Sequence, residues 1–119
     1  MTRFISDPGQ IRNSDNTVKH NAFMPPKTRR LSVYWISGVQ DATIWSIGDA
    51  HVAPTRGPII ARADLNSLAV YAEELSVDVT GTPHPRHADI VGWDMTSTKL
   101  RLQAVKLSSS ATLRRVRTI

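Results

Sequence analysis

The chain has 119 residues, of which 40% are hydrophobic and 21% are charged, and it contains no cysteine. This length suits one domain with its own hydrophobic core, and the missing thiols exclude disulfides and thiolate metal sites. No apolar run approaches the roughly 20 residues of a membrane-spanning helix, and residues 1–8 lack the apolar stretch of a signal peptide. We therefore expect a cytoplasmic protein that does not associate with membranes.

The net charge of +5 is distributed unevenly along the chain. The segment 99–119 contains six basic residues and no acidic residue, whereas the rest of the chain is close to neutral. The six are Lys99, Arg101, Lys106, Arg114, Arg115 and Arg117. Such asymmetry indicates a nucleic acid or an acidic protein as the partner. The structural alternative is a solvated basic helix face without a partner.

The first half of the chain predicts a loop, two strands and a helix. Residues 1–16 are polar and interrupted by proline and glycine, which is typical of a loop. A weak strand is expected over residues 17–24. A clearer strand is expected over residues 31–36, which are rich in β-branched and aromatic side chains. Residues 41–48 predict a short helix with Asp41 as its N-cap and Gly48 at its end.

Strands and helices alternate in the second half of the chain. A short strand is expected over residues 59–63, and strands over 76–80 and 88–93 follow. Between them, Asp64 is expected to open a helix whose apolar stripe faces the strand over 31–36. That stripe consists of Leu65, Leu68, Ala69, Ala72 and Leu75. A basic terminal helix is expected over residues 99–119, with a stripe formed by Leu100, Ala104, Leu107 and Ala111.

This order of short strands and helices indicates an α+β fold. We expect a single small domain over residues 1–119, with a mostly antiparallel sheet of about four to five short strands and two to three helices packed on it. A doubly wound parallel sheet is not expected, because several connections are too short for crossover helices.

Three blocks of the sequence resemble a group of small bacterial proteins. They are Ala22–Pro26 (AFMPP), Leu31–Tyr34 (LSVY) and Arg86–Trp93 (RHADIVGW). In that group, an AFMPP…LSV block is followed by an RHA-x-IVGW block and a terminal helix. The resemblance covers most of the chain from about residue 18 onward. It implies a bacterial or mobile-element origin, and it carries no activity, cofactor or site.

The densest cluster of titratable side chains lies just before the last predicted strand. It contains His84, Arg86, His87 and Asp89, on a segment stiffened by prolines. Imidazoles titrate near neutral pH, so one could remove a proton and another could donate one, while Arg86 stabilises charge on a phosphate. Small metal-independent enzymes that act on RNA or a nucleotide use such a set, and His20 could complete it.

Two other interpretations of the loop remain open. In the first, His84 and His87 bind a metal ion, which would need a third ligand from His20, His51 or Asp89. The spacing of these residues matches no specific metal motif, so no metal or cofactor is expected. In the structural interpretation, His87 donates to a backbone carbonyl and Asp89 pairs with Arg86.

The sequence thus leaves three hypotheses. The leading one is a small, non-enzymatic bacterial module that binds nucleic acid or a partner protein through the basic C-terminal helix. The second is an enzyme that uses His84, Arg86 and His87, and the third is a purely structural subunit of a larger complex. Convergence of His20, His51, His84 and His87 on one cleft would favour the enzyme.

Overall fold

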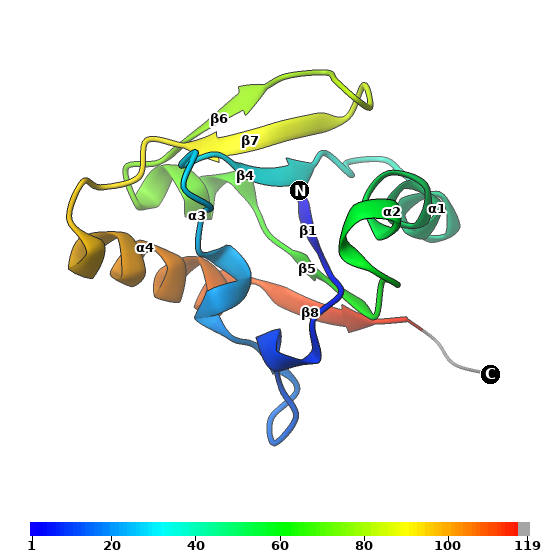
Figure 1. The fold of residues 1–119 in the computed structure, drawn as a ribbon, viewed down its shortest axis with the longest axis horizontal. Coiled ribbons are helices and arrows are strands. Elements are labelled where there is room, and N and C mark those ends of the chain that lie inside the picture. Colours follow the sequence, from blue (N-terminus) through cyan, green and yellow to red (C-terminus); the bar gives the residue numbers. More distant parts are fainter. Residues whose placement is uncertain (117–119) are drawn as a thin grey trace.

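Six antiparallel strands form the central sheet of the protein, whose computed structural model describes residues 1–116 (Figure 1). The order of the strands across the sheet is β6-β7-β4-β1-β5-β8. Their bounds are β1 Thr2–Ile5, β4 Leu31–Tyr34, β5 Ala61–Asp64, β6 Ser76–Val79, β7 His87–Val91 and β8 Thr112–Arg115. A separate two-stranded ribbon pairs β2 (Ile11–Arg12) with β3 (Thr17–Val18).

Four α-helices occur within residues 1–116, together with two 3₁₀-helices. The α-helices are α1 Asp41–His51, α2 Ala53–Arg56, α3 Ser67–Ala72 and α4 Ser97–Ser110, and the 3₁₀-helices are η1 Pro8–Gln10 and η2 His20–Phe23. The α+β class and the antiparallel sheet are confirmed, and the sheet has more strands than expected. Within residues 1–116 no helix has both the length and the apolar character that crossing a membrane requires.

The two faces of the sheet carry different side chains, because neighbouring residues of a strand point to opposite sides. One face packs against α3, α4 and η2 through a large apolar core that includes Val33, Ile90 and Leu107. The other face packs against α1 and α2 through a smaller cluster that contains Phe4 and Tyr34 (Figure 1). The sheet therefore separates a closed apolar layer from a second, partly polar one.

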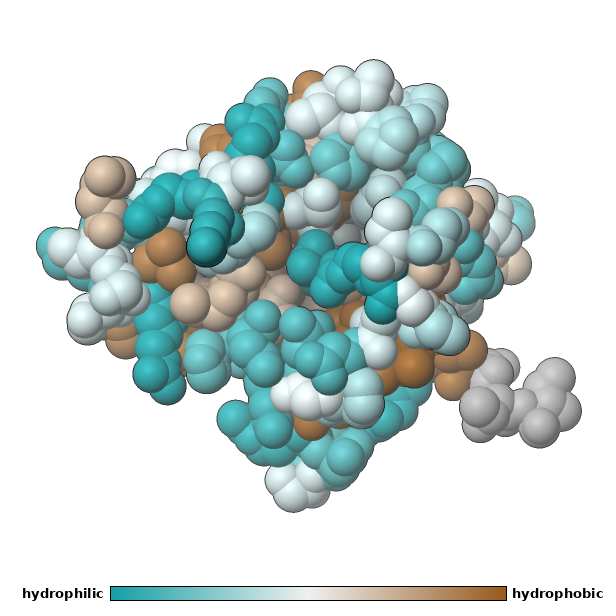
Figure 2. Space-filling model, viewed as in Figure 1, coloured by the Kyte–Doolittle hydropathy of each residue, from teal (hydrophilic) through white to brown (hydrophobic). Residues whose placement is uncertain are grey.

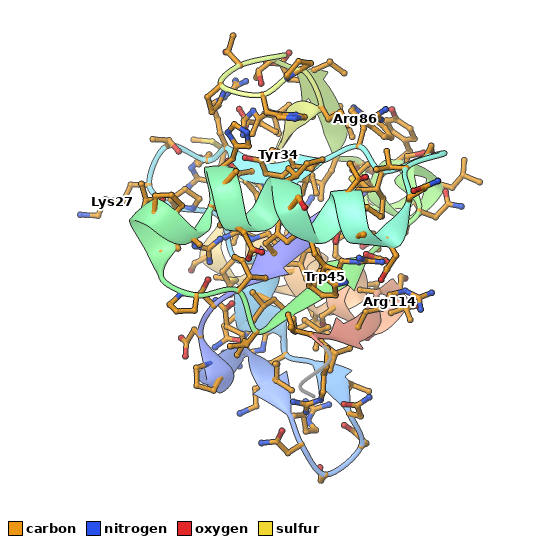
Figure 3. All side chains as sticks on the ribbon, turned by 90° about the vertical axis from the view of Figure 1, so that its right-hand side faces the viewer. Lys27, Tyr34, Trp45, Arg86 and Arg114 are labelled. Atoms are coloured by element: carbon orange, nitrogen blue, oxygen red, sulfur yellow. The ribbon has the colours of Figure 1, made fainter. Side chains whose placement is uncertain are left out.

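A buried arginine holds α1 on this second face. Arg62 of β5 is only 3% exposed. Its Nη2 donates to Asp41 at 2.8 Å, its Nε donates to Asp64 at 3.1 Å, and its guanidinium lies 4.6 Å from the centre of the Trp45 ring. In Figure 3, Trp45 lies beneath α1 and Arg114 lies near the end of the same helix. Two carboxylates and an aromatic face compensate much of the burial of this cation, while its buried Nη1 has no hydrogen-bond partner within residues 1–116.

Both ends of the chain differ from the expectation. Residues 1–16 were expected to be a loop, but β1 lies in the middle of the sheet. The terminal helix expected over residues 99–119 is wrong in its bounds: α4 ends at Ser110, and β8 follows after one residue. As an edge strand, β8 pairs with β5 along its whole length.

The helix expected to open at Asp64 is also wrong. Asp64 ends β5 and accepts from Arg62 and Arg114, and α3 begins only at Ser67, with Asn66 as its N-cap. Because the helix is shifted and short, Leu68 is 72% exposed and Val70 is buried instead. Ala72 is exposed as well, so neither it nor Leu68 faces β4.

The helix expected over residues 41–48 is confirmed and continues to His51, although two details are different. Gln40 rather than Asp41 occupies the N-cap position, and Gly48 lies inside the helix rather than at its end. A Cβ atom at Gly48 would stand 2.7 Å from the ring of Phe4. The glycine therefore allows α1 to approach β1 closely.

Candidate active site

A pocket of about 430 Å³ opens where β1 and β4 separate. These strands pair only at Thr2 and Tyr34, whereas β1 pairs with β5 along its whole length. The backbone of Ser32 therefore has no partner strand on this side. The walls of the pocket come from both sheet strands, from the C-terminal end of α1, from α2 and from residues just before β4.

Arg3 fills the gap between the two strands. Its Nη1 donates to the Ser32 carbonyl at 2.9 Å, and its Nε donates to the Ala22 carbonyl at 3.2 Å. Its Nη2 has no hydrogen-bond partner among residues 1–116, and the side chain lines the pocket. Burial, followed by the positive charge of Arg56, lowers the pKa of the Arg3 guanidinium.

The pocket is positively charged. Arg3 and Arg56 both line it, and within residues 1–116 neither forms a salt bridge. Two like charges near one cavity stabilise an anion placed between them. Arg30 also lines the pocket, but its guanidinium contacts both Asp78 and Asp89, so its charge is already balanced. The positive charge that no salt bridge holds therefore belongs to Arg3 and Arg56, and the carboxylate of Asp7 acts on Arg56 only at a distance.

Tyr34 forms the floor of the pocket between Phe4 and the histidines. Its ring centre lies 5.6 Å from that of Phe4 and 5.3 Å from that of His87. Burial raises the pKa of the Tyr34 phenol, and the charge of Arg3 opposes this only in part. The hydroxyl is therefore protonated at neutral pH. It has no hydrogen-bond partner in the described part of the chain and is not fully enclosed, so it can donate to a ligand.

His84 packs against His51 beside the pocket, with ring centres 4.8 Å apart. His51 is the last residue of α1 and lines the pocket. The Nδ1 of His84 accepts from the backbone N–H of Arg86 at 3.1 Å, so the neutral ring carries its proton on Nε2. Burial, then the neighbouring His51 and Arg86, lowers the pKa of His84. His84 is therefore a neutral donor at pH 7.

His87 is held rigidly beside Tyr34. Its Nε2 lies 2.9 Å from the Ser32 hydroxyl, and its Nδ1 contacts the Thr80 hydroxyl. Ser32, Tyr34 and His87 lie on the same face because Tyr34 is directly opposite His87 in the β4–β7 pairing. The expectation that His87 donates to a backbone carbonyl is therefore wrong, since its partners are hydroxyl groups. With both ring nitrogens occupied, His87 positions Tyr34 and the β6 edge.

The structure separates the three residues expected to act together. His84 and His87 both contact Tyr34, but only His87 lines the pocket, and the Arg86 side chain is exposed outside it. In Figure 3, Arg86 lies farther from α1 than Tyr34 does. Arg86 contributes its backbone N–H instead, and Asp89 pairs with Arg30 rather than with Arg86. His20 lines a different pocket, next to β3 and the end of α4.

The basic residues of the C-terminal segment also fall into separate groups. Lys99, Arg101 and Lys106 are exposed on α4 and form no salt bridge within the part of the chain that the structure describes. On β8, Arg114 pairs with Asp64 at 2.9 Å, and Arg115 donates to the side chains of Asn13 and Asn16. Arg117 lies outside the described residues.

Three pocket residues were missed by sequence reasoning, namely Arg3, Tyr34 and Arg56. Arg3 had a signal, since it interrupts an otherwise mostly apolar run at the start of the chain. The other two are brought to the pocket by the sheet pairing and by the turn after α1, which no local pattern encodes. Within residues 1–116 no group of three His, Asp or Glu side chains is arranged to hold a metal ion.

Comparison with known proteins finds no family model, no curated protein and no solved structure that matches this chain.

Proposed function

We propose that the protein is a metal-independent enzyme that acts on a phosphate ester of RNA or a nucleotide. The observation that carries this proposal is that His51, His87 and Tyr34 line one pocket together with Arg3 and Arg56, while His84 packs against the rings of His51 and Tyr34. Titratable groups beside uncompensated cations are the parts that acid–base chemistry on a phosphate needs. We place this activity in the cytoplasm of a bacterium, because the absence of cysteine fits a reducing compartment and the sequence blocks resemble small bacterial proteins.

RNA offers a reaction that needs no external reactant. In the step we propose, His51 takes the proton of a 2′-hydroxyl, and the 2′-oxygen forms a bond to the adjacent phosphorus. The bond from phosphorus to the 5′-oxygen breaks, and that oxygen takes the proton of the Tyr34 hydroxyl. The products are a 2′,3′-cyclic phosphate and a 5′-hydroxyl, and the proton returns from His51 to Tyr34 through solvent.

The remaining pocket residues support this step. Arg3 and Arg56 face the phosphate and stabilise the charge that develops on its non-bridging oxygens. Neutral His84 packs against the rings of His51 and Tyr34 and adds no charge beside the pocket. His87 touches neither the leaving nor the attacking oxygen in this scheme, and it acts by holding Tyr34 in place.

The test is cleavage of an RNA dinucleotide in the presence of a chelator, followed by chromatographic detection of the cyclic phosphate. We expect turnover, and we expect His51→Ala and Tyr34→Phe each to lower kcat by about 10²–10⁴-fold, the usual contribution of one acid or base. Leu68→Ala, an exposed change on α3, is the control for unspecific effects of substitution and should keep full turnover. Turnover that survives both pocket substitutions, or no turnover by the unmodified protein, would contradict the proposal.

A second candidate function is nucleic-acid binding by the exposed face of α4. The observation that favours it is that Lys99, Arg101 and Lys106 have no salt-bridge partner within residues 1–116, while the β8 arginines are used by the fold. Replacing all three with alanine should weaken binding and reduce the salt dependence by a slope of about 2, at roughly 0.7 per phosphate of a single strand. Arg12→Ala on the ribbon is the control, and affinity that does not depend on salt would exclude this function.

A further inference from the structure

A second groove adjoins the candidate active site and shares a wall with it. The groove has a volume of about 510 Å³ and lies between the segment before β4 and the start of α4. Pro26 lines both cavities, with Arg30 on the active-site side and Lys27 and Arg29 on the groove side. The two cavities therefore meet at Pro26, and a ligand that occupies both would cross this residue.

The floor of the groove is apolar and accessible. Met24, Pro25, Met95 and Leu100 line it, and Met95 is 83% exposed. Figure 2 shows hydrophobic surface over α4 with hydrophilic side chains around it. An exposed, flexible methionine beside prolines offers a flat apolar contact of the kind that the face of a nucleobase uses.

The rim of the groove is positively charged. Lys27 and Arg29 line it, and Lys99 lies close enough for its charge to act on Asp94. Asp94 is the acidic residue nearby, and its carboxylate already accepts from the backbone N–H and the hydroxyl of Thr96. The three cations thus exceed the one carboxylate, and the balance of charge favours phosphates.

We propose that the active pocket and this groove together bind single-stranded RNA, with one phosphate at Arg3 and Arg56 and an adjacent nucleotide on Met95 and Lys27. The proposal rests on the proposed function and names its substrate as a polynucleotide rather than a free nucleotide. A single strand is required because the faces of its bases are free to contact the apolar floor, whereas a duplex buries them in its stack.

The experiment measures, by fluorescence anisotropy, the affinity for a dinucleotide, for a short single-stranded oligonucleotide and for the same sequence as a duplex. All three ligands carry a 2′-deoxy nucleotide at the scissile position, so that they are not cleaved. We expect the single strand to bind about tenfold or more tightly than the dinucleotide, which is the scale of one stacked base and one phosphate. Lys27→Ala and Met95→Ala should each reduce this advantage severalfold and leave dinucleotide affinity unchanged. The matched controls are Arg12→Ala and Leu68→Ala, exposed residues of similar chemistry elsewhere.

The possible outcomes separate the two proposals. If the single strand binds no more tightly than the dinucleotide, or if the duplex binds equally well, the single-strand proposal is overturned, even if the dinucleotide is cleaved. Loss of oligonucleotide affinity in the two control variants would overturn it as well. If Lys27→Ala and Met95→Ala act as expected but no RNA is cleaved, the groove binds RNA and the proposed catalytic function fails.

Discussion

The two faces of the central sheet differ in how completely helices cover them. The face under α3, α4 and η2 is a closed apolar core, whereas α1 and α2 cover only part of the other face and leave its β4–β7–β6 end polar. Strand β7 belongs to both layers, because Ala88 and Ile90 point into the core while His87 and Asp89 point to the polar side. One strand can therefore stabilise the fold and build a site with alternate residues.

The comparison predicts that the closed face carries most of the stability. Leu107 of α4 is fully buried in it, so Leu107→Ala should lower the free energy of unfolding by about 2–5 kcal/mol. Leu102, on the same helix but 55% exposed, is the matched control, and Leu102→Ala should change stability by less than about 0.5 kcal/mol. Chemical denaturation measures both. Similar losses in the two variants would mean that α4 does not pack through this face.

A second prediction concerns the contact between α1 and the partly polar face. Gly48→Ala places a methyl group against the Phe4 ring, and we expect a loss of about 1–3 kcal/mol from the forced movement. Because Phe4 also lines the pocket, this variant should weaken RNA binding, whereas Leu107→Ala should leave binding unchanged in the folded fraction. Asp49→Ala, exposed on the same helix, is the control. Unaltered stability and binding would show that α1 has room to move.

The predictable parts of the fold are those whose pattern is local. The strands over 31–36, 76–80 and 88–93 and the helix over 41–48 were identified because alternation, apolar residues and turn signals lie within the segments themselves. By contrast, β1 is short and contains Thr2 and Arg3, and its partners come from Tyr34 and from β5, far along the chain. Its role as a central strand follows from those distant pairings, which the segment itself does not reveal.

Long-range contacts also explain the errors at Asp64 and at the C-terminus. Asp64 resembles a helix start, but Arg62 and Arg114 bind its carboxylate and keep the residue in the sheet. The basic residues after Ser110 are compatible with the surface of a helix as well as with an edge strand. They form a strand because they pair with the otherwise open edge of β5. For the site, local density singled out His84 and His87, of which His87 lines the pocket and His84 packs against His51, while Arg3 and Tyr34 required knowledge of where β1 and β4 separate.

The smallest predicted effect concerns pH and the rim of the polar face. The pKa of His84 is held below its ordinary value of 6.5 by burial and then by His51 and Arg86. The unfolded chain therefore binds more protons just below pH 6.5, so the contribution of His84 to stability decreases as the pH falls through this window. In an NMR titration, His84 should titrate below 6.5, and His51→Ala should raise its midpoint. A titration midpoint of His84 at or above 6.5 in the unmodified protein would contradict the burial of His84 against His51.

The two salt bridges of Arg30 limit how this part of the sequence can vary among related proteins. One guanidinium joins the segment before β4 to Asp89 of β7 and Asp78 of β6. Loss of the arginine alone would leave two carboxylates beside a pocket that is otherwise suited to anions, and loss of one acid alone would add a free cation there. The three positions are therefore expected to change together in evolution, so that a relative with a neutral residue at the position of Arg30 would also have neutral residues in place of Asp78 and Asp89.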